Sequence, residues 1–194
     1  MFKIIVVGNS GVGKTSIVAR FALDKYEQNY KATIAADFCQ KILNVKGNEL
    51  RLNIWDLVGM DTNFASTSKS FCRNCNGVIM VADITDGDTI DDTTKWRDMV
   101  LAESKDPEGV PILLVVNKYD LVLEREEEGA LLEDYMTQEW LDEFAEEQGF
   151  IGAFRVSAKE DINITDSFSA LTKQMIMKEI IQAEKCQNED CEYD

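Results

Sequence analysis

A glycine-rich run near the start of the chain has the residue types and spacing of a phosphate-binding loop. Residues 8–15 read Gly-Asn-Ser-Gly-Val-Gly-Lys-Thr and match the pattern G-x-x-x-x-G-K-[ST], between an apolar strand pattern and a helix pattern. The glycines allow backbone N–H groups to converge on phosphate oxygens, and the helix N-terminus adds the positive end of its dipole. Lys14 would reach the β- and γ-phosphates, and the Thr15 hydroxyl would ligate Mg²⁺. The pattern therefore predicts a nucleotide site, with an ordinary glycine-rich turn as the alternative.

Two later polar motifs predict which base the nucleotide carries. Residues 117–120 read Asn-Lys-Tyr-Asp after one apolar strand pattern, and residues 157–159 read Ser-Ala-Lys after a weaker one. The Asp120 carboxylate can accept two N–H donors from the Watson–Crick edge of guanine, a pair of donors that adenine lacks. A site built around such donors rejects analogues without them by large factors. The motifs therefore predict GDP and GTP as ligands.

Strand and helix patterns alternate along the chain, which indicates an α/β fold with a mostly parallel sheet. We expect strands at residues 1–8, 37–45, 49–56, 77–81, 110–117 and 153–156, and a helix from the glycine-rich run to about Leu23. Only a short turn around Gly47 joins the second and third strands, so this pair must be antiparallel, because parallel strands need a longer crossover. All three polar motifs then lie at the carboxyl ends of strands, where open α/β sheets bind ligands.

Three further helix patterns carry apolar stripes that we interpret as core packing. The stripes consist of Trp96, Met99 and Val100; of Trp140, Leu141, Phe144 and Ala145; and of Phe168, Leu171, Met175 and Ile176. Internal repeats and proline-rich linkers are absent from the sequence. We therefore expect one domain over residues 1–182, followed by a polar, acidic tail over residues 183–194.

The charge of the chain argues against several classes of partner. The 20 Lys and Arg residues stand against 36 Asp and Glu residues, which gives a net charge of −16. Nucleic acid backbones and anionic membranes both demand clustered positive charge, so we expect no nucleic acid partner and no unaided membrane docking. No apolar run approaches the ~18 residues that span a bilayer, and the apolar start is too short for a signal peptide. The default expectation is a cytoplasmic protein.

The cysteines and the missing histidine narrow the chemistry further. Cys72 and Cys75 have the spacing of a zinc-ligand pair, but no second pair follows at that spacing and the chain contains no histidine. We interpret the spacing as chance. Five cysteines are an odd number, which argues against a disulfide framework. The absence of histidine also removes serine–histidine–aspartate chemistry.

Together with two further stretches, the motifs resemble those of the Ras superfamily of small GTPases, and most of all its Rab branch. The stretches read Tyr-Lys-Ala-Thr-Ile-Ala-Ala-Asp-Phe at residues 30–38 and Trp-Asp-Leu-Val-Gly at residues 55–59. The resemblance extends from Phe2 to about Ile181. It implies a P-loop nucleoside-triphosphatase G domain with a six-stranded, mostly parallel sheet, one antiparallel strand and flanking helices. It also implies GDP and GTP as ligands and Mg²⁺ as the cofactor.

The resemblance assigns roles to individual residues. Thr33 would be the switch threonine that ligates Mg²⁺ and meets the γ-phosphate, Asp56 would hold Mg²⁺ through a water, and the Gly59 amide would sense the γ-phosphate. Tyr26 would place its ring against guanine. The implied metal ligands are Thr15, Thr33 and Asp56, and the implied catalytic residues are Lys14, Thr33 and Gly59. The implied nucleotide-binding residues are Ser10, Gly11, Val12, Gly13, Lys14, Thr15, Ser16, Tyr26, Thr33, Gly59, Asn117, Lys118, Asp120, Ser157, Ala158 and Lys159.

Two loops would respond to the bound nucleotide. By the resemblance, the segments from Asp24 to Ala36 and from Leu57 to Ser70 order around the γ-phosphate and relax with GDP. Effectors, exchange factors and activating proteins would bind through these loops, and the protein would act in vesicle trafficking. The alternative is an interaction module that holds nucleotide as a structural ligand and hardly cycles. A P-loop kinase that uses ATP is a third interpretation, but it leaves residues 117–120 and 157–159 unexplained.

One departure from the family bears on hydrolysis. Met60 stands where the family has the glutamine that orients the attacking water, and its thioether has no N–H to donate. We therefore expect intrinsic hydrolysis at or below the slow rate of this class, on the order of 10⁻⁴ s⁻¹. The alternatives are that Asp61 positions the water, or that an activating protein of the TBC type supplies an arginine and a glutamine.

The acidic segment and the C-terminus depart from the family as well. The segment over residues 121–136 is longer than in most Rab proteins, and with the following helix it forms an acidic run. The run consists of Glu124, Glu126, Glu127, Glu128, Glu133, Asp134, Glu139, Asp142, Glu143, Glu146 and Glu147. We interpret it as a solvated face, with docking of a basic partner as the alternative. Cys191 is a poor match to a prenylation motif, so we expect no autonomous membrane anchor, vesicle association only through partners, or a chain that is part of a longer one.

Overall fold

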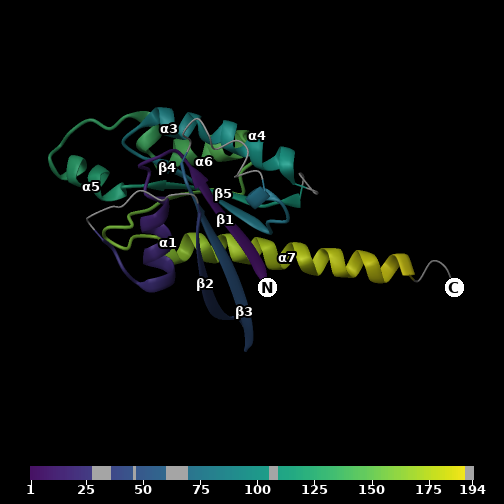
Figure 1. Cartoon of the computed structure of the whole chain (residues 1–194). Helices are drawn as coiled ribbons and strands as arrows, with labels where there is room; N and C mark the ends of the chain where they lie inside the picture. The colour runs from purple at the N-terminus through teal and green to yellow at the C-terminus, as the bar shows by residue number, and fades with distance from the viewer. Residues whose placement is uncertain (28–35, 46, 60–69, 105–108, 191–194) are drawn as a thin grey trace.

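The computed structural model contains one six-stranded sheet with the strand order β2-β3-β1-β4-β5-β6 (Figure 1). It describes residues 1–27, 36–45, 47–59, 70–104 and 109–190. The strands are β1 Phe2–Gly8, β2 Ala36–Val45, β3 Asn48–Leu57, β4 Gly77–Asp83, β5 Ile112–Asn117 and β6 Ala153–Arg155. β2 and β3 pair antiparallel, and the other neighbouring strands pair parallel. This arrangement confirms the predicted fold class.

Two strand boundaries differ from the expected ones by two residues, and the other differences amount to one residue each. β4 continues past residue 81 to Asp83, because Asp83 pairs with Asn117 of β5 and extends the ladder. β5 begins at Ile112 and not at residue 110. Pro111 precedes it and has no N–H with which to donate to a ladder. Both differences lie at the ends of strands, where sequence patterns are least informative.

Helices cover both faces of the sheet. Figure 1 shows α3 Gly87–Asp91, α4 Thr93–Glu103 and α6 Gln138–Glu147 on one side, and α1 Lys14–Leu23 and α7 Ile164–Asp190 on the other. A further helix, α5 Tyr119–Glu127, and a short 3₁₀ helix, η2 Asp134–Met136, occupy the segment between β5 and α6. The sheet is therefore the central layer of three, as expected for parallel strands joined by helical crossovers.

Alternating side chains of the strands build two cores, one on each face of the sheet. In β1, Ile5 and Val7 belong to the core under α4 and α6, whereas Ile4 and Val6 belong to the core under α1 and α7. The predicted apolar stripes point into these cores. The buried members are Trp96, Val100, Leu141, Ala145, Phe168, Leu171 and Met175, and the half-buried members at the margins are Met99, Trp140, Phe144 and Ile176.

The last helix extends past the expected end of the domain. α7 continues through the expected boundary at residue 182 and ends at Asp190, and Figure 1 shows its C-terminal part extending beyond the sheet. Met177, Ile180 and Ile181 are about half exposed on this part of the helix. Among the described residues, no helix combines the length and the apolar character needed to cross a bilayer.

The acidic run lies on the surface of the inserted segment and of α6. Its carboxylate side chains, which run from Glu124 to Glu147, are all exposed. Leu131, in the connection between α5 and η2, is also almost fully exposed, at 99% of its surface. Exposure of every carboxylate in the run is compatible with a solvated face and equally with a docking surface for a basic partner.

Candidate nucleotide-binding site

The glycine-rich run forms a tight turn between β1 and α1. Gly8 ends β1 with φ 146°, and a Cβ there would lie 2.1 Å from the carbonyl oxygen of Val81 in β4. Gly13 precedes the first residue of α1 with φ 95°, and a Cβ there would lie 2.2 Å from Nδ2 of Asn117. Both positions therefore need glycine, because the backbone approaches a neighbour too closely for any side chain.

Lys14 folds back over this turn at the start of α1. Its Nζ donates to the carbonyl oxygens of Gly8 at 3.0 Å and of Asn9 at 2.7 Å, and the side chain is buried. Burial lowers the pKa of Lys14 to about 8, and the negative charge of Asp56 opposes that shift. The ammonium group of Lys14 is thus shielded from water at the turn, where it would attract an anion.

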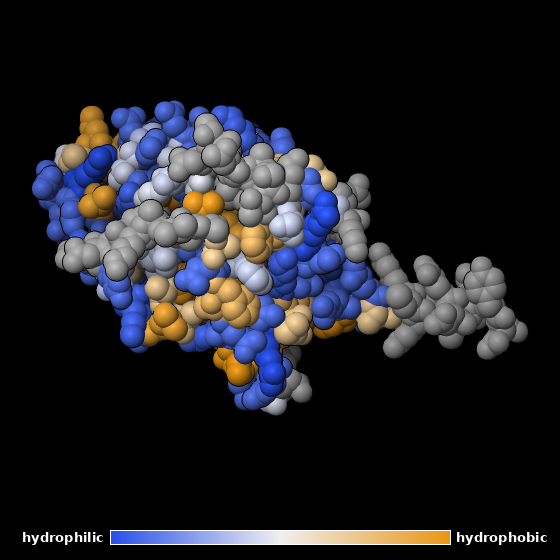
Figure 2. All heavy atoms as spheres, in the orientation of Figure 1, coloured by the Kyte–Doolittle hydropathy of each residue, from blue (hydrophilic) through white to orange (hydrophobic). Residues whose placement is uncertain are grey.

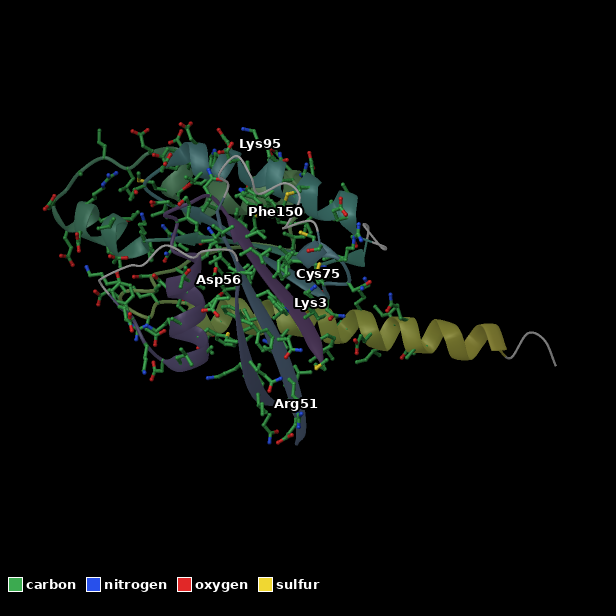
Figure 3. All side chains as sticks on the ribbon, viewed as in Figure 1. Lys3, Arg51, Asp56, Cys75, Lys95 and Phe150 are labelled. Carbon is green, nitrogen blue, oxygen red and sulfur yellow. The ribbon has the colours of Figure 1, made fainter. Side chains whose placement is uncertain are left out.

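Thr15 and Asp56 present oxygen ligands beside the turn. The Thr15 hydroxyl donates to Oδ2 of Asp56 at 2.5 Å. Asp56 is 1% exposed and lies near the end of β3, where that strand approaches α1 (Figure 3). Hydroxyl and carboxylate oxygens are the hard donors that Mg²⁺ prefers, so the residues present fit this cofactor. Thr33, the third expected ligand, lies outside the described residues.

Gly59 follows β3 and packs against the glycine-rich turn. It is buried, and a Cβ at this position would lie 2.4 Å from the backbone N of Ser10 and 2.6 Å from its Cα. The backbone of residue 59 therefore occupies space that only a glycine leaves open. Met60, the next residue, lies outside the described residues, as do most of the residues of both predicted switch loops.

Asn117 joins two of the three motifs through its side chain. Its Nδ2 donates to the carbonyl oxygen of Val12 at 2.9 Å, and its Oδ1 accepts from the backbone N–H of Ala158 at 3.1 Å. The side chain is 4% exposed, so both bonds are shielded from water. This amide holds the glycine-rich turn and the loop after β6 at a set distance from each other.

The Asp120 carboxylate is held by the residues of the third motif. Its Oδ1 accepts from the Ser157 hydroxyl at 2.7 Å, and its Oδ2 lies 3.5 Å from Nζ of Lys159. The charge of Asp120 raises the pKa of Lys159. Lys118 has a left-handed backbone, with φ 68°, and its Nζ lies 2.5 Å from Oδ2 of Asp83. The three motifs thus form one polar cluster at the carboxyl ends of β1, β5 and β6.

A cavity of about 440 Å³ opens between these motifs. Its volume lies in the range of ~300–1,000 Å³ that small-molecule sites occupy. It is lined by Gly11, Gly13, Ser16, Tyr26, Glu27, Asn117, Lys118, Asp120, Leu121, Ala158 and Lys159. Other predicted site residues contact this lining or the glycine-rich turn: Ser157 bonds to Asp120, Asn117 bonds to Val12, Lys14 bonds to Gly8 and Asn9, and Gly59 abuts Ser10. Thr15 lines a separate small hollow with Asp56. Residues far apart in sequence therefore meet around one space that is large enough for a ligand.

The motifs alone do not reveal every residue of this region. Glu27 and Leu121 line the cavity, and each directly follows a predicted site residue, Tyr26 and Asp120. Asn9 anchors the glycine-rich turn to α4: its Nδ2 donates to Asp92 at 2.7 Å, and its Oδ1 accepts from the indole N–H of Trp96 at 2.8 Å. These partners lie more than 80 residues away in sequence. No local pattern could have indicated them.

Aromatic side chains form a partly exposed row beside the second predicted switch loop. The ring centroids of Phe38 and Trp55 are 5.0 Å apart, and those of Trp55 and Phe71 are 5.2 Å apart. Phe38 is 48% exposed. Figure 2 shows apolar areas among charged ones on the face that carries β2 and β3. Apolar surface of this kind suits contact with another protein.

Comparisons with known proteins agree with the fold and with the motifs. The sequence model of the Ras family matches residues 3–177. Over 181 residues the chain is 34% identical to Ras-related protein Rab-7b of Paramecium octaurelia, which covers 92% of this chain and 83% of that protein. Over 181 residues it is 33% identical to GTP-binding protein yptV5 of Volvox carteri, with 92% and 84% covered. Over 179 residues it is 32% identical to Ras-related protein Rab-7L1 of Rattus norvegicus, with 91% and 82% covered. The chain therefore belongs to the Ras family of small GTPases, which bind guanine nucleotides, and within the Ras superfamily it is Rab-like.

Proposed function

We propose that this chain is a molecular switch that binds GDP and GTP with Mg²⁺ and hydrolyses GTP slowly or only with a partner. The observation that carries the proposal is the single cavity in which Asp120 and Asn117 face the glycine-rich turn. A phosphate chain and a purine are the two ends of one ligand, so a site for both must hold them at a fixed separation. The hydrogen bonds of Asn117 to Val12 and Ala158 provide that separation.

The phosphates would bind at the glycine-rich turn. Backbone N–H groups of residues 10–16 and the N-terminus of α1 supply donors and a positive dipole end. Lys14 now donates to two backbone carbonyls, and phosphate oxygens would replace these neutral acceptors with charged ones. Burial removes the water that stabilises the positive charge of Lys14. The negative charge of a bound polyphosphate would stabilise it instead.

Thr15 and Asp56 would hold Mg²⁺, and Thr33 would join them when GTP is bound. When present, the ion neutralises negative charge on the β- and γ-phosphate oxygens. The hydroxyl and carboxylate already lie side by side, so the pair is arranged for a hard cation before it arrives. Gly59, whose backbone abuts Ser10, would report the γ-phosphate to the second switch loop.

The base would be selected by the far side of the cavity. Asp120 would accept two N–H donors from guanine, while Ser157 and Lys159 keep the carboxylate oriented. Tyr26 and the stems of Lys118 and Lys159 would pack against the ring, since all three line the cavity. A buried carboxylate left without its donors is costly, which is the physical basis of rejection of adenine nucleotides.

A direct test is the nucleotide content of the purified protein. We expect GDP or GTP at close to one equivalent when Mg²⁺ is supplied, and loss of the preference for guanine in Asp120→Ala. Uptake of ADP and GDP with equal affinity, or an unchanged preference in Asp120→Ala, would contradict the proposed base contact. The control is Asp142→Ala, an exposed carboxylate on α6 away from the cavity.

Hydrolysis would proceed by attack of water on the γ-phosphorus, with GDP leaving and inorganic phosphate released. Lys14, Thr33 and Gly59 would stabilise the transferring group, but Met60 offers no donor to orient the water. Single-turnover measurement on bound GTP tests this role. We expect Met60→Gln to raise the rate by about tenfold or more, which corresponds to about 1.4 kcal/mol of transition-state stabilisation. An unchanged rate would indicate that another residue, such as Asp61, places the water.

Effectors, exchange factors and activating proteins would bind through the segments from Asp24 to Ala36 and from Leu57 to Ser70, and the partly exposed aromatic row adjoins both. By its Rab-like character the switch would act in vesicle trafficking.

Met60 also favours a second candidate, a module that retains nucleotide and does not cycle. Amide exchange across both segments separates the two functions. A difference between the GTP and GDP complexes supports the switch, and identical profiles support the static module.

A further inference from the structure

Arg20, to which the sequence motifs assign no role, links α1 to the loop after β6. Its guanidinium donates from Nε to the carbonyl oxygen of Ala158 and from Nη2 to that of Lys159, both at 3.0 Å. The acceptors lie 138 and 139 residues further along the chain. The Arg20 side chain is 16% exposed; its bond to Ala158 is partly buried, and its bond to Lys159 lies at the surface. One side chain therefore ties the phosphate-loop helix to the loop that carries the third motif.

The same guanidinium also faces the end of α1. Its Nη1 lies 3.8 Å from Oδ1 of Asp24, and its Cζ lies 5.9 Å from the ring centroid of Tyr26. Asp24 ends α1 in the left-handed conformation, with φ 53°, and the chain then leads to Tyr26 on the cavity wall. Arg20 thus contacts, from behind, the segments that form two walls of the cavity.

The loop that Arg20 holds is the one that orients the base-contacting carboxylate. Ser157 and Lys159 both contact Asp120, and the N–H of Ala158 donates to Asn117. The loop therefore presents its side chains and its N–H toward the cavity, while its two carbonyl oxygens point away, toward Arg20. A shift of the loop after loss of the carbonyl bonds would move the groups that hold Asp120.

We propose that Arg20 is a positioning residue for guanine recognition. It acts through Ala158 and Lys159 on Asp120, without contact with the nucleotide. The inference rests on the proposed function, since it concerns the same cavity. The planar fork of arginine suits two adjacent carbonyl oxygens, because Nε and Nη2 donate side by side, whereas lysine offers a single charged centre. Arginine at this position therefore fixes the orientation of the loop as well as its distance from α1.

The test compares wild-type protein with Arg20→Ala and Arg20→Lys. The readouts are the dissociation rate of GDP and the ratio of affinities for GDP and inosine diphosphate, which lacks the 2-amino group that Asp120 would contact. We expect Arg20→Ala to release GDP about tenfold faster, as the loss of charge-assisted hydrogen bonds behind a binding loop would produce. We expect the affinity ratio to fall by about threefold or more, because a displaced Asp120 discriminates less well. Arg20→Lys keeps the charge, and we expect it to resemble Arg20→Ala.

Arg97 provides the matched control. It lies on α4, it is 22% exposed, and its Nη1 donates to the carbonyl oxygen of Gln148 at 2.6 Å, away from the cavity. Arg97→Ala removes an equivalent guanidinium anchor, and we expect both readouts to stay within about twofold of wild type, as for a site that does not couple to the cavity. If Arg20→Ala and Arg97→Ala change the readouts equally, Arg20 is an ordinary structural residue. If Arg20→Ala does not fold, Arg20→Lys carries the comparison. Wild-type protein that binds no guanine nucleotide would instead overturn the proposed function, and the role of Arg20 with it.

Discussion

Single atoms decide much of the behaviour expected of this site. At Gly13 and Gly59 a Cβ would lie within 2.5 Å of a neighbouring atom, and at Lys14 burial lowers the pKa to about 8. Each of these constraints belongs to one residue and its immediate surroundings. A substitution at such a position should therefore have a specific effect that a neighbouring substitution lacks.

Gly59→Ala tests the close packing of residue 59 on the glycine-rich turn. The added methyl group must displace either residue 59 or the backbone of Ser10, because a separation of 2.4 Å is far below contact distance. We expect GDP binding to persist and the GTP-dependent change in amide exchange over the second switch loop to be lost. Gly87→Ala is the control, since its Cβ would lie 3.3 Å from the Tyr135 ring and should be tolerated. Normal switching in Gly59→Ala would show that this backbone contact is dispensable.

Cys72 gives a pH dependence whose sign follows from its burial. Burial and the neighbouring Cys75 raise the pKa of the Cys72 thiol from 9.0 to about 11. Between these values the folded protein keeps a proton that the unfolded chain releases, so the free energy of unfolding falls as pH rises. Urea unfolding under reducing conditions at pH 8, 9 and 10 measures this decline. We expect the free energy of unfolding to decline less steeply with pH in Cys72→Ala. An equally steep decline would show that the Cys72 thiol is not its source. Figure 3 shows the neighbouring Cys75 close to Lys3, whose positive charge works against the shift.

At the scale of elements, the site depends on how α1 is held against the sheet. α1 supplies Lys14 and Thr15 at its first turn and Arg20 at its last, so a small rotation of the helix would move all three together. Its inner face packs on α7, and the rings of Phe21 and Phe168 stack with centroids 3.8 Å apart. The packing of two helices thus sets the position of the phosphate site.

Phe168→Ala tests this packing. Removal of a fully buried phenyl group leaves a cavity under α1, and such changes cost about 3–5 kcal/mol of unfolding free energy. We expect a loss of that size in denaturant unfolding, accompanied by weaker GDP binding. Met177→Ala, at a 54% exposed position on the same helix, should change the stability by less than about 0.5 kcal/mol. Equal effects of the two substitutions would indicate that the α1–α7 contact is not what holds the site.

At the scale of the whole molecule, the nucleotide and the fold should stabilise each other. The cavity lies where three strands end and where α1, α5 and the loop after β6 converge, so a ligand there bridges segments from both halves of the chain. The net charge of −16 on the whole chain opposes compaction. Bound Mg²⁺ would offset part of the negative charge that a nucleotide adds.

Thermal unfolding with and without ligand measures this linkage. A ligand that binds only the folded state at 100 times its dissociation constant adds about 2.7 kcal/mol to the unfolding free energy. We therefore expect GDP with Mg²⁺ to raise the unfolding temperature, ADP with Mg²⁺ to leave it unchanged, and EDTA to remove most of the gain. A gain from ADP equal to that from GDP would argue against selection of guanine. Persistence of the full gain in EDTA would argue against a role for the metal.

Much of this organisation could be predicted from the sequence, because the relevant patterns are local. An apolar strand followed by a glycine-rich run, polar motifs at the ends of two later strands, and a turn too short for a parallel crossover were sufficient to predict a mostly parallel sheet with one antiparallel pair. The strand ends and the length of α7 were less accessible, since pairing partners such as Asp83 and Asn117 determine them.

The sequence by itself determined the family, the order of the strands along the chain and the residue types available around the site. Only the tertiary structure decided that Asn117 bridges Val12 and Ala158, that Lys14 is desolvated, and that Arg20 holds a loop 138 residues away. The physical reason is that hydrogen bonding and desolvation depend on distances through space and on exclusion of water. The sequence pattern of one segment contains neither the distances to other segments nor the exclusion of water. Both arise only when the segments pack together.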